Sequence, residues 1–113
     1  MADRKIIFYE DHFVDFFNTL NQKAKDKVLY VLRLIQIIDV IPSNILKSIT
    51  GVKNLFEIRI EIESNIYRIF CCFDKGNLII LFNGFQKKIE KTPVNEINKA
   101  KQLMKEYFDS KDK

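Results

Sequence analysis

The sequence predicts a small α+β domain in which helices pack on an antiparallel sheet. Residues 55–93 alternate between apolar and charged side chains, which is typical of strands with one buried face. Before them, residues 13–20 and 22–38 carry apolar residues at helical spacing, and a third such pattern follows Pro93. The expected element order is therefore β, α, α, β, β, β, α, with the helices on one face of the sheet.

The first third of the chain holds a short strand and two amphipathic helices. Residues 5–9 are the strand candidate, and Asp11 is placed to cap the helix that follows. The apolar residues of that helix are Phe13, Phe16, Phe17 and Leu20. A second helix is expected from about Gln22 to Ile38. Residues 45–53 then form a connection that contains a glycine.

Strand alternation divides residues 56–63 between two faces. The apolar face carries Phe56, Ile58, Ile60 and Ile62, and the charged face carries Glu57, Arg59, Glu61 and Glu63. A tight hairpin with Ser64 and Asn65 at its centre places Arg68 opposite Glu61. Arg68 then lies on the charged face.

A second turn at Lys75–Gly76 completes the meander, because glycine accepts a positive φ. With a two-residue loop there, Phe85 and Lys87 fall on the same side as Arg68. A slip of one residue at this turn brings Lys88 to that side in place of Lys87.

The last element is a helix that follows Thr92, which is placed to cap it, and Pro93, which suits its first position. Its buried stripe is expected at Ile97, Ala100, Met104 and Tyr107 or Phe108. The polar tail 109–113 is expected to fray.

Length and composition favour one folded domain spanning residues 1–113. The chain is 47% hydrophobic and 30% charged, unlike a disordered protein. Its longest apolar runs are too short to span a bilayer, and its first residues do not resemble a signal peptide. We therefore expect a cytoplasmic protein with no membrane partner. A net charge of +4 is compatible with a nucleic-acid partner.

The sequence lacks the residues that a metal site or a redox-active cysteine pair would need. Cys71 and Cys72 are adjacent and are expected to stay reduced as small apolar strand residues. The single histidine is His12, so no Cys/His zinc site can be assembled. We expect no metal and no cofactor.

The strand segment and the lysine-rich segment after it resemble a known family. The matching pieces, in chain order, are LFEIRIE, NIYRIFCCFDKG and LIILFNGFQKKIEKTP. With the two preceding helices, they resemble the phage-derived branch of the RelE/HigB toxin superfamily over nearly the whole chain. The most specific feature is the combination of YRIF, GFQKK and TP at this spacing.

This resemblance implies a RelE-like fold and the toxin of a type II toxin–antitoxin pair. Such a toxin cuts mRNA on the ribosome, and a helix-turn-helix antitoxin neutralises it. The positions that match the family's basic active-site elements are Arg59, Arg68, Lys87 and Lys88. The sequence departs from the commonest pattern at Cys71, Cys72, Ile89 and Glu90, the last of which adds a carboxylate among the cations.

RNA can be cut without a metal when the ribose 2′-hydroxyl attacks the neighbouring phosphorus. The enzyme must then move two protons and stabilise charge on the phosphate. Arg68 is the first candidate for charge stabilisation and Arg59 the second, because guanidinium groups bind phosphate in bidentate fashion. Candidates for proton transfer are Lys87, Lys88 and Lys91 and, as bases, Glu57 and Glu61. Candidate RNA contacts are Lys53, Phe85 and Lys91.

A purely structural interpretation stands beside each assignment. Arg68 opposite Glu61 is then an ordinary cross-strand ion pair, Phe85 a core residue, and the lysines a solvated loop. Three functions remain open: the leading one is a ribosome-dependent mRNA endonuclease, and the alternatives are a module that binds RNA or the ribosome without cutting and a non-catalytic protein-interaction domain. The glutamates that alternate with the arginines favour the last, since mixed charges suit a protein partner.

Overall fold

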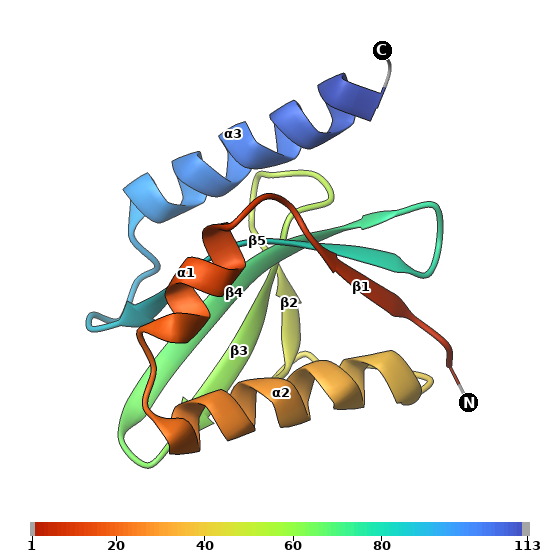
Figure 1. The fold of residues 1–113 in the computed structure, drawn as a ribbon. Coiled ribbons are helices and arrows are strands. Elements are labelled where there is room, and N and C mark those ends of the chain that lie inside the picture. Colours follow the sequence, from red (N-terminus) through yellow and green to blue (C-terminus); the bar gives the residue numbers. More distant parts are fainter. Residues whose placement is uncertain (1, 112–113) are drawn as a thin grey trace.

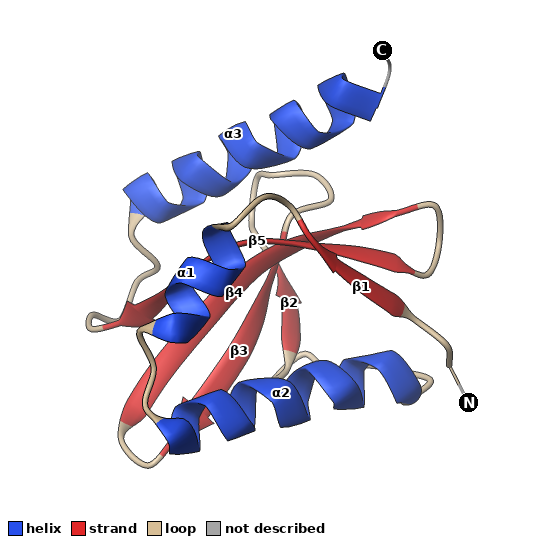
Figure 2. Cartoon of the chain, in the orientation of Figure 1, coloured by secondary structure: helices blue, strands red, loops and turns tan. Residues whose placement is uncertain are grey.

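A computed structural model of the chain describes residues 2–111. A central sheet separates α1 and α2, on one side, from α3 on the other (Figures 1 and 2). The elements in chain order are β1 (Lys5–Phe8), α1 (His12–Asn18), α2 (Gln22–Ile37), β2 (Leu46–Ser48), β3 (Phe56–Ile62), β4 (Asn65–Asp74), β5 (Leu78–Lys87) and α3 (Val94–Lys111). The α+β class is confirmed.

The sheet has five strands in the order β1-β5-β4-β3-β2, and it is mixed. β1 runs parallel to β5, whereas the other neighbours are antiparallel. The antiparallel sheet expected from the sequence thus carries one parallel strand, β1, at its edge. It was wrong to expect only a connection in residues 45–53, because Leu46–Ser48 forms β2 at the edge beside β3.

Helices cover both faces of the sheet, not one face as the sequence had indicated. On the two-helix face, α1 contacts β5 and α2 contacts β3. On the single-helix face, α3 contacts β4 and β5. The sequence carried a signal for this arrangement: residues 69–73 and 78–82 are continuous apolar runs, which are typical of strands buried on both faces.

The hairpin between β3 and β4 turns at Glu63 and Ser64, because Ile62 pairs with Asn65. Arg59 therefore lies opposite Arg68, and the predicted pair of Glu61 with Arg68 does not form. The shift amounts to two residues, and side chains alternate with a period of two. Every residue of the hairpin thus keeps its predicted face.

The hairpin between β4 and β5 differs from its prediction twice, and the two differences compensate. Its loop has three residues, 75–77, since Asp74 pairs with Leu78. Farther along, β5 has a β-bulge: only one residue of β4 lies between Ile69 and Cys71, but two residues of β5, 82 and 83, lie opposite it. Beyond this bulge Phe85 lies opposite Arg68, so Phe85 and Lys87 share its face as predicted.

The helix ends depart in part from the predicted caps. The Asn21 side chain accepts a hydrogen bond from the Ala24 N–H at 2.9 Å and caps α2. Asp11 occupies the predicted N-cap position of α1, but its side chain makes no capping hydrogen bond. At the other end of α2, the Arg4 guanidinium donates to the carbonyls of Ile35 and Ile38 at 2.9 and 2.6 Å. Arg4 therefore satisfies carbonyls that the helix leaves unpaired.

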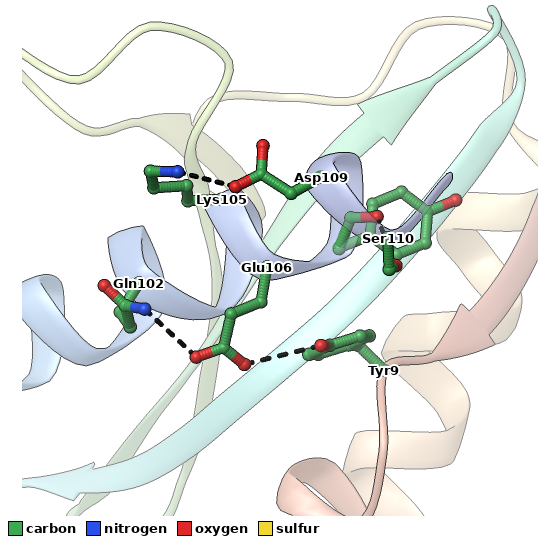
Figure 3. A network of polar contacts seen from close by, with 7 residues as sticks. Tyr9, Gln102, Lys105, Glu106, Asp109 and Ser110 are labelled. Atoms are coloured by element: carbon green, nitrogen blue, oxygen red, sulfur yellow. Dashed lines mark hydrogen bonds and ion pairs between the residues drawn. The ribbon is translucent and has the colours of Figure 1, made fainter. Parts of the chain in front are cut away.

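Polar contacts hold the C-terminal half of α3 in place (Figure 3). The Tyr9 hydroxyl, just after β1, donates to Glu106 at 3.4 Å, and Gln102 donates to the other oxygen of that carboxylate at 3.1 Å. The helix continues to Lys111, past the point where fraying was predicted to begin. Residues 112–113 lie outside the described part. Within residues 2–111, no helix has the length and apolarity needed to cross a membrane.

Candidate active site

A cluster of charges lies on the single-helix face, centred on the buried carboxylate of Glu57. Its Oε2 lies 2.9 Å from Nε of Arg68 and 3.6 Å from Nε of Arg59. The two arginines occupy directly opposed positions on β4 and β3, where like charges repel. Glu57 offsets this repulsion because it pairs with both. The Arg68 contact is an ion pair, because Nε of Arg68 makes no hydrogen bond.

Arg68 is the buried member of the pair, with a side chain only 2% exposed. Its guanidinium also donates to the Tyr67 carbonyl at 3.0 Å. Burial, followed by the charge of Arg59, lowers the pKa of Arg68, while Glu57 and Glu61 oppose that change. An arginine nevertheless stays charged in a protein. Arg68 is therefore placed to hold Glu57 and Arg59 in position, and Arg59, 30% exposed, reaches the surface.

Two adjoining hollows open over this cluster and share Arg59, Lys87 and Glu90. One, of about 580 Å³, extends to β2 and Thr92, and the other, of about 660 Å³, extends to the β3–β4 turn. We refer to both together as the basic groove. Its charged lining consists of Lys47, Glu57, Arg59, Glu61, Arg68, Lys87, Lys88, Glu90 and Lys91.

The structure brings most of the predicted site residues into this groove. The seven that line it are Glu57, Arg59, Glu61, Arg68, Lys87, Lys88 and Lys91. Phe85 does not, because its ring stacks on Phe70 at 5.7 Å between centroids and lines a separate hollow with His12. Lys53 is also elsewhere, in a hollow beside the C-terminal half of α3.

Lys47 and Thr92 are among the groove residues that were not predicted as site residues. Lys47 lies opposite Glu57 on β2, and this three-residue strand is too short to show alternation. Thr92 had been predicted to cap α3, but its hydroxyl donates to Oε1 of Glu57 at 3.4 Å. This contact connects the loop between β5 and α3 to the arginine pair. Only the fold could reveal it, since 35 residues separate the partners.

The histidine and the two cysteines of the described part lie outside the groove. Nε2 of His12 is 3.0 Å from Oε1 of Glu10, in the hollow that also contains Asp15. Both cysteines are buried, and burial raises the pKa of the Cys71 thiol strongly and that of Cys72 to about 12. Neither is a ready nucleophile. Among residues 2–111, no group of three or more His, Cys, Asp or Glu side chains is arranged to hold a metal.

The fold is that of a small α+β protein of the RelE-like class. One similar solved structure is the crystal structure of the archaeal RelE–RelB complex from Pyrococcus horikoshii OT3, at a TM-score of 0.53 and 15% identity over 74% of this chain and 93% of that chain. At that identity the match concerns the fold.

A comparison of the sequence with models of protein families identifies the family of this chain. The model of the family described as "Phage derived protein Gp49-like (DUF891)" matches residues 15–105. The chain belongs to this family, which is of the RelE/HigB toxin type, so the resemblance inferred from the sequence is confirmed. A search of curated proteins returned no match.

Proposed function

We propose that this protein is the toxin of a type II toxin–antitoxin pair and that it cuts mRNA in the basic groove while the mRNA is bound to the ribosome. The observation that carries the proposal is the pair of opposed arginines on β3 and β4, held together by Glu57 and bordered by Lys87. Family membership supports the toxin assignment. A cytoplasmic location follows from it, since translating ribosomes are there.

The arginine pair is suited to stabilising a phosphate that gains negative charge. Arg59 reaches the groove surface, so its guanidinium is the group proposed to contact the phosphate oxygens. Arg68 lies beneath and acts as a positioning residue through Glu57. This proposal reverses the order of the two arginines that the sequence had suggested, because the Arg68 side chain is almost fully buried.

The proposed reaction forms a bond between the 2′-oxygen and phosphorus and breaks the bond from phosphorus to the 5′-oxygen. The products are a 2′,3′-cyclic phosphate and a 5′-hydroxyl. Glu61 is the stronger candidate to accept the 2′-hydroxyl proton, because it is exposed, whereas Glu57 is engaged by both arginines and Thr92. Lys87, Lys88 or Lys91 would donate a proton to the leaving oxygen.

The direct test is cleavage of a defined mRNA on purified ribosomes, followed by mapping of its 3′ ends. Wild-type protein is expected to produce cuts within codons. Arg59→Ala should reduce the rate about 100- to 1000-fold, as for loss of one group that stabilises transition-state charge. Arg33→Ala, at an exposed position on α2, is the matched control and should cut normally. Wild-type protein that binds ribosomes but leaves the mRNA intact would contradict the proposal.

The partner proposed with this activity is a helix-turn-helix antitoxin encoded beside the toxin. Expression of the toxin alone should arrest growth, and co-expression of the neighbouring protein should restore it. Growth arrest that persists in Arg59→Ala would show that toxicity does not depend on the groove.

A second candidate function is binding to RNA or the ribosome without cleavage. It is favoured by the burial of Arg68 and by the place of His12, which lies outside the groove. In this case wild-type protein produces no new 3′ ends. Arg59→Ala should then weaken RNA binding and reduce the slope of log affinity against log salt by about one.

A further inference from the structure

A hollow of about 450 Å³ lies between the β2–β3 loop and the C-terminal half of α3. It shares no lining residue with the basic groove. Val52, Met104 and Phe108, each partly exposed, form an apolar floor. Partly exposed apolar side chains gathered in one concave surface are a common feature of partner-binding sites.

The walls of this hollow are fixed by contacts on both sides. Asn54, at a φ of 64°, donates its amide to the Phe73 carbonyl at 2.9 Å and accepts from the Phe73 N–H at 3.4 Å. The Phe108 ring packs edge-on against Tyr107 at 5.0 Å between centroids. The hollow is therefore formed before any partner arrives, which reduces the entropy lost on binding.

Three exposed lysines surround the apolar floor: Lys53, Lys101 and Lys105. Lys105 pairs with Asp109 at 2.5 Å, as Figure 3 shows, whereas among the described residues Lys53 and Lys101 form no ion pair. The rim therefore has positive charge that the chain itself does not neutralise. An apolar centre with a charged border is the usual anatomy of a protein–protein interface.

These features favour one class of occupant. A nucleic-acid backbone would leave the apolar floor without a partner, since phosphate contacts rely on donors. A membrane surface prefers apolar side chains that protrude, and here they line a concavity. A protein segment with a large apolar side chain and neighbouring carboxylates would satisfy both the floor and the rim.

We propose that this hollow is a docking site for an acidic protein segment that inserts one large apolar side chain between Val52, Met104 and Phe108. Aspartate or glutamate on either side of that residue pairs with Lys53 and Lys101. The proposal does not depend on RNA cleavage, because the hollow and the basic groove are separate surfaces.

A random dodecapeptide library displayed on phage provides the test, with the full chain as the target. Selected peptides are expected to carry acidic residues on both sides of Leu, Ile, Met or Phe. The best peptide, made synthetically, should bind Lys53→Glu/Lys101→Glu at least tenfold more weakly than wild type. Met104→Ala should also weaken it, through loss of the floor.

Lys88→Glu/Lys91→Glu is the matched control, because it makes the same change of charge at exposed positions in the basic groove. It should bind the peptide like wild type. Equal weakening by both double variants would overturn the proposal, as would selected peptides without acidic enrichment. Binding to a dodecaribonucleotide and to anionic vesicles is measured for the same variants. If Lys53→Glu/Lys101→Glu loses one of these ligands while Lys88→Glu/Lys91→Glu keeps it, and peptide binding is unchanged, the hollow binds RNA or lipid instead.

Discussion

The two faces of the sheet are built from the same strands but differ in chemistry. The two-helix face buries only apolar side chains between the sheet and α1 and α2. The single-helix face packs apolar side chains, among them Phe70 and Phe82, against α3. All the buried polar residues of the described part belong to that second face: Glu57, Arg68, Asp74 and Asn83.

The difference reflects how much of each face the helices can cover. Two helices cover one face, whereas a single helix leaves the strand ends beyond it open. At one of those ends charged side chains form the basic groove. The position of α3 thus sets the boundary between core and site.

The largest effect on stability is expected from Arg68→Ala. Removing this side chain leaves the buried Glu57 carboxylate with only the more exposed Arg59 as a charged partner. Loss of one member of a buried ion pair typically costs about 3–5 kcal/mol in the free energy of unfolding. Urea denaturation measures it, and Arg33→Ala, exposed on α2, should stay within about 0.5 kcal/mol of wild type. Equal stability of the two variants would mean that the pair is not buried in solution.

On the two-helix face, a smaller loss is expected from Gly84→Ala. A Cβ atom added there would lie 2.5 Å from Cδ2 of Phe16, so the α1 ring would have to move. Overpacking of this kind costs about 1–3 kcal/mol. Phe16→Leu should partly rescue Gly84→Ala in the double variant. A double-mutant cycle from thermal unfolding tests this, and simple additivity would show that the two residues do not touch.

The two faces also differ in how far the sequence could predict them. Alternation assigned Arg59 and Arg68 to one face correctly, although the pairing was wrong by two residues, because an even shift leaves faces unchanged. The bulge in β5 preserved the face of Lys87 after the loop had added a residue. Local pattern was sufficient for these assignments.

Features that depend on packing between distant elements could not be predicted in this way. The burial of Arg68, the place of Lys53 beside α3 and the bond from Thr92 to Glu57 each require the tertiary structure. The second layer of helix was indicated only by the apolar runs of β4 and β5. Face assignment is thus a local property, whereas access to solvent depends on the whole fold.

The far end of the single-helix face gives a pH-dependent prediction. Hydrogen bonds from Lys111 and then Tyr107 lower the pKa of Asp74 below its ordinary value of 3.8. The Tyr107 phenol stays protonated as the donor, since burial and the Asp74 bond raise its pKa to about 12. A carboxyl with a lowered native pKa stabilises the fold above its ordinary pKa, and that contribution disappears as the pH falls through the native value.

Asp74→Asn should therefore be less stable than wild type at neutral pH. The loss in the free energy of unfolding should be smaller than that of Arg68→Ala. The difference in stability between wild type and Asp74→Asn should become smaller as the pH falls below 3.8. Thermal unfolding at a series of pH values measures it. Asp109→Asn, which removes an exposed pair with Lys105, should show no such difference. A difference that stays constant into acid would rule out the Asp74 contribution.

The smallest loss of stability, and the sharpest test of how the two faces differ, is expected when both buried charges are replaced by apolar residues. Glu57→Leu/Arg68→Met keeps similar volumes and removes the cost of burying two ions. Apolar replacements of buried ion pairs are often neutral or stabilising by about 1–4 kcal/mol. The double variant should therefore unfold at or above the wild-type urea midpoint. Arg59 then loses the carboxylate that positions it. The rate of mRNA cleavage on the ribosome should therefore fall in the double variant, as in Arg59→Ala. A stable and inactive double variant would establish that the charges of this face serve the groove, whereas an unstable one would show that they hold the fold.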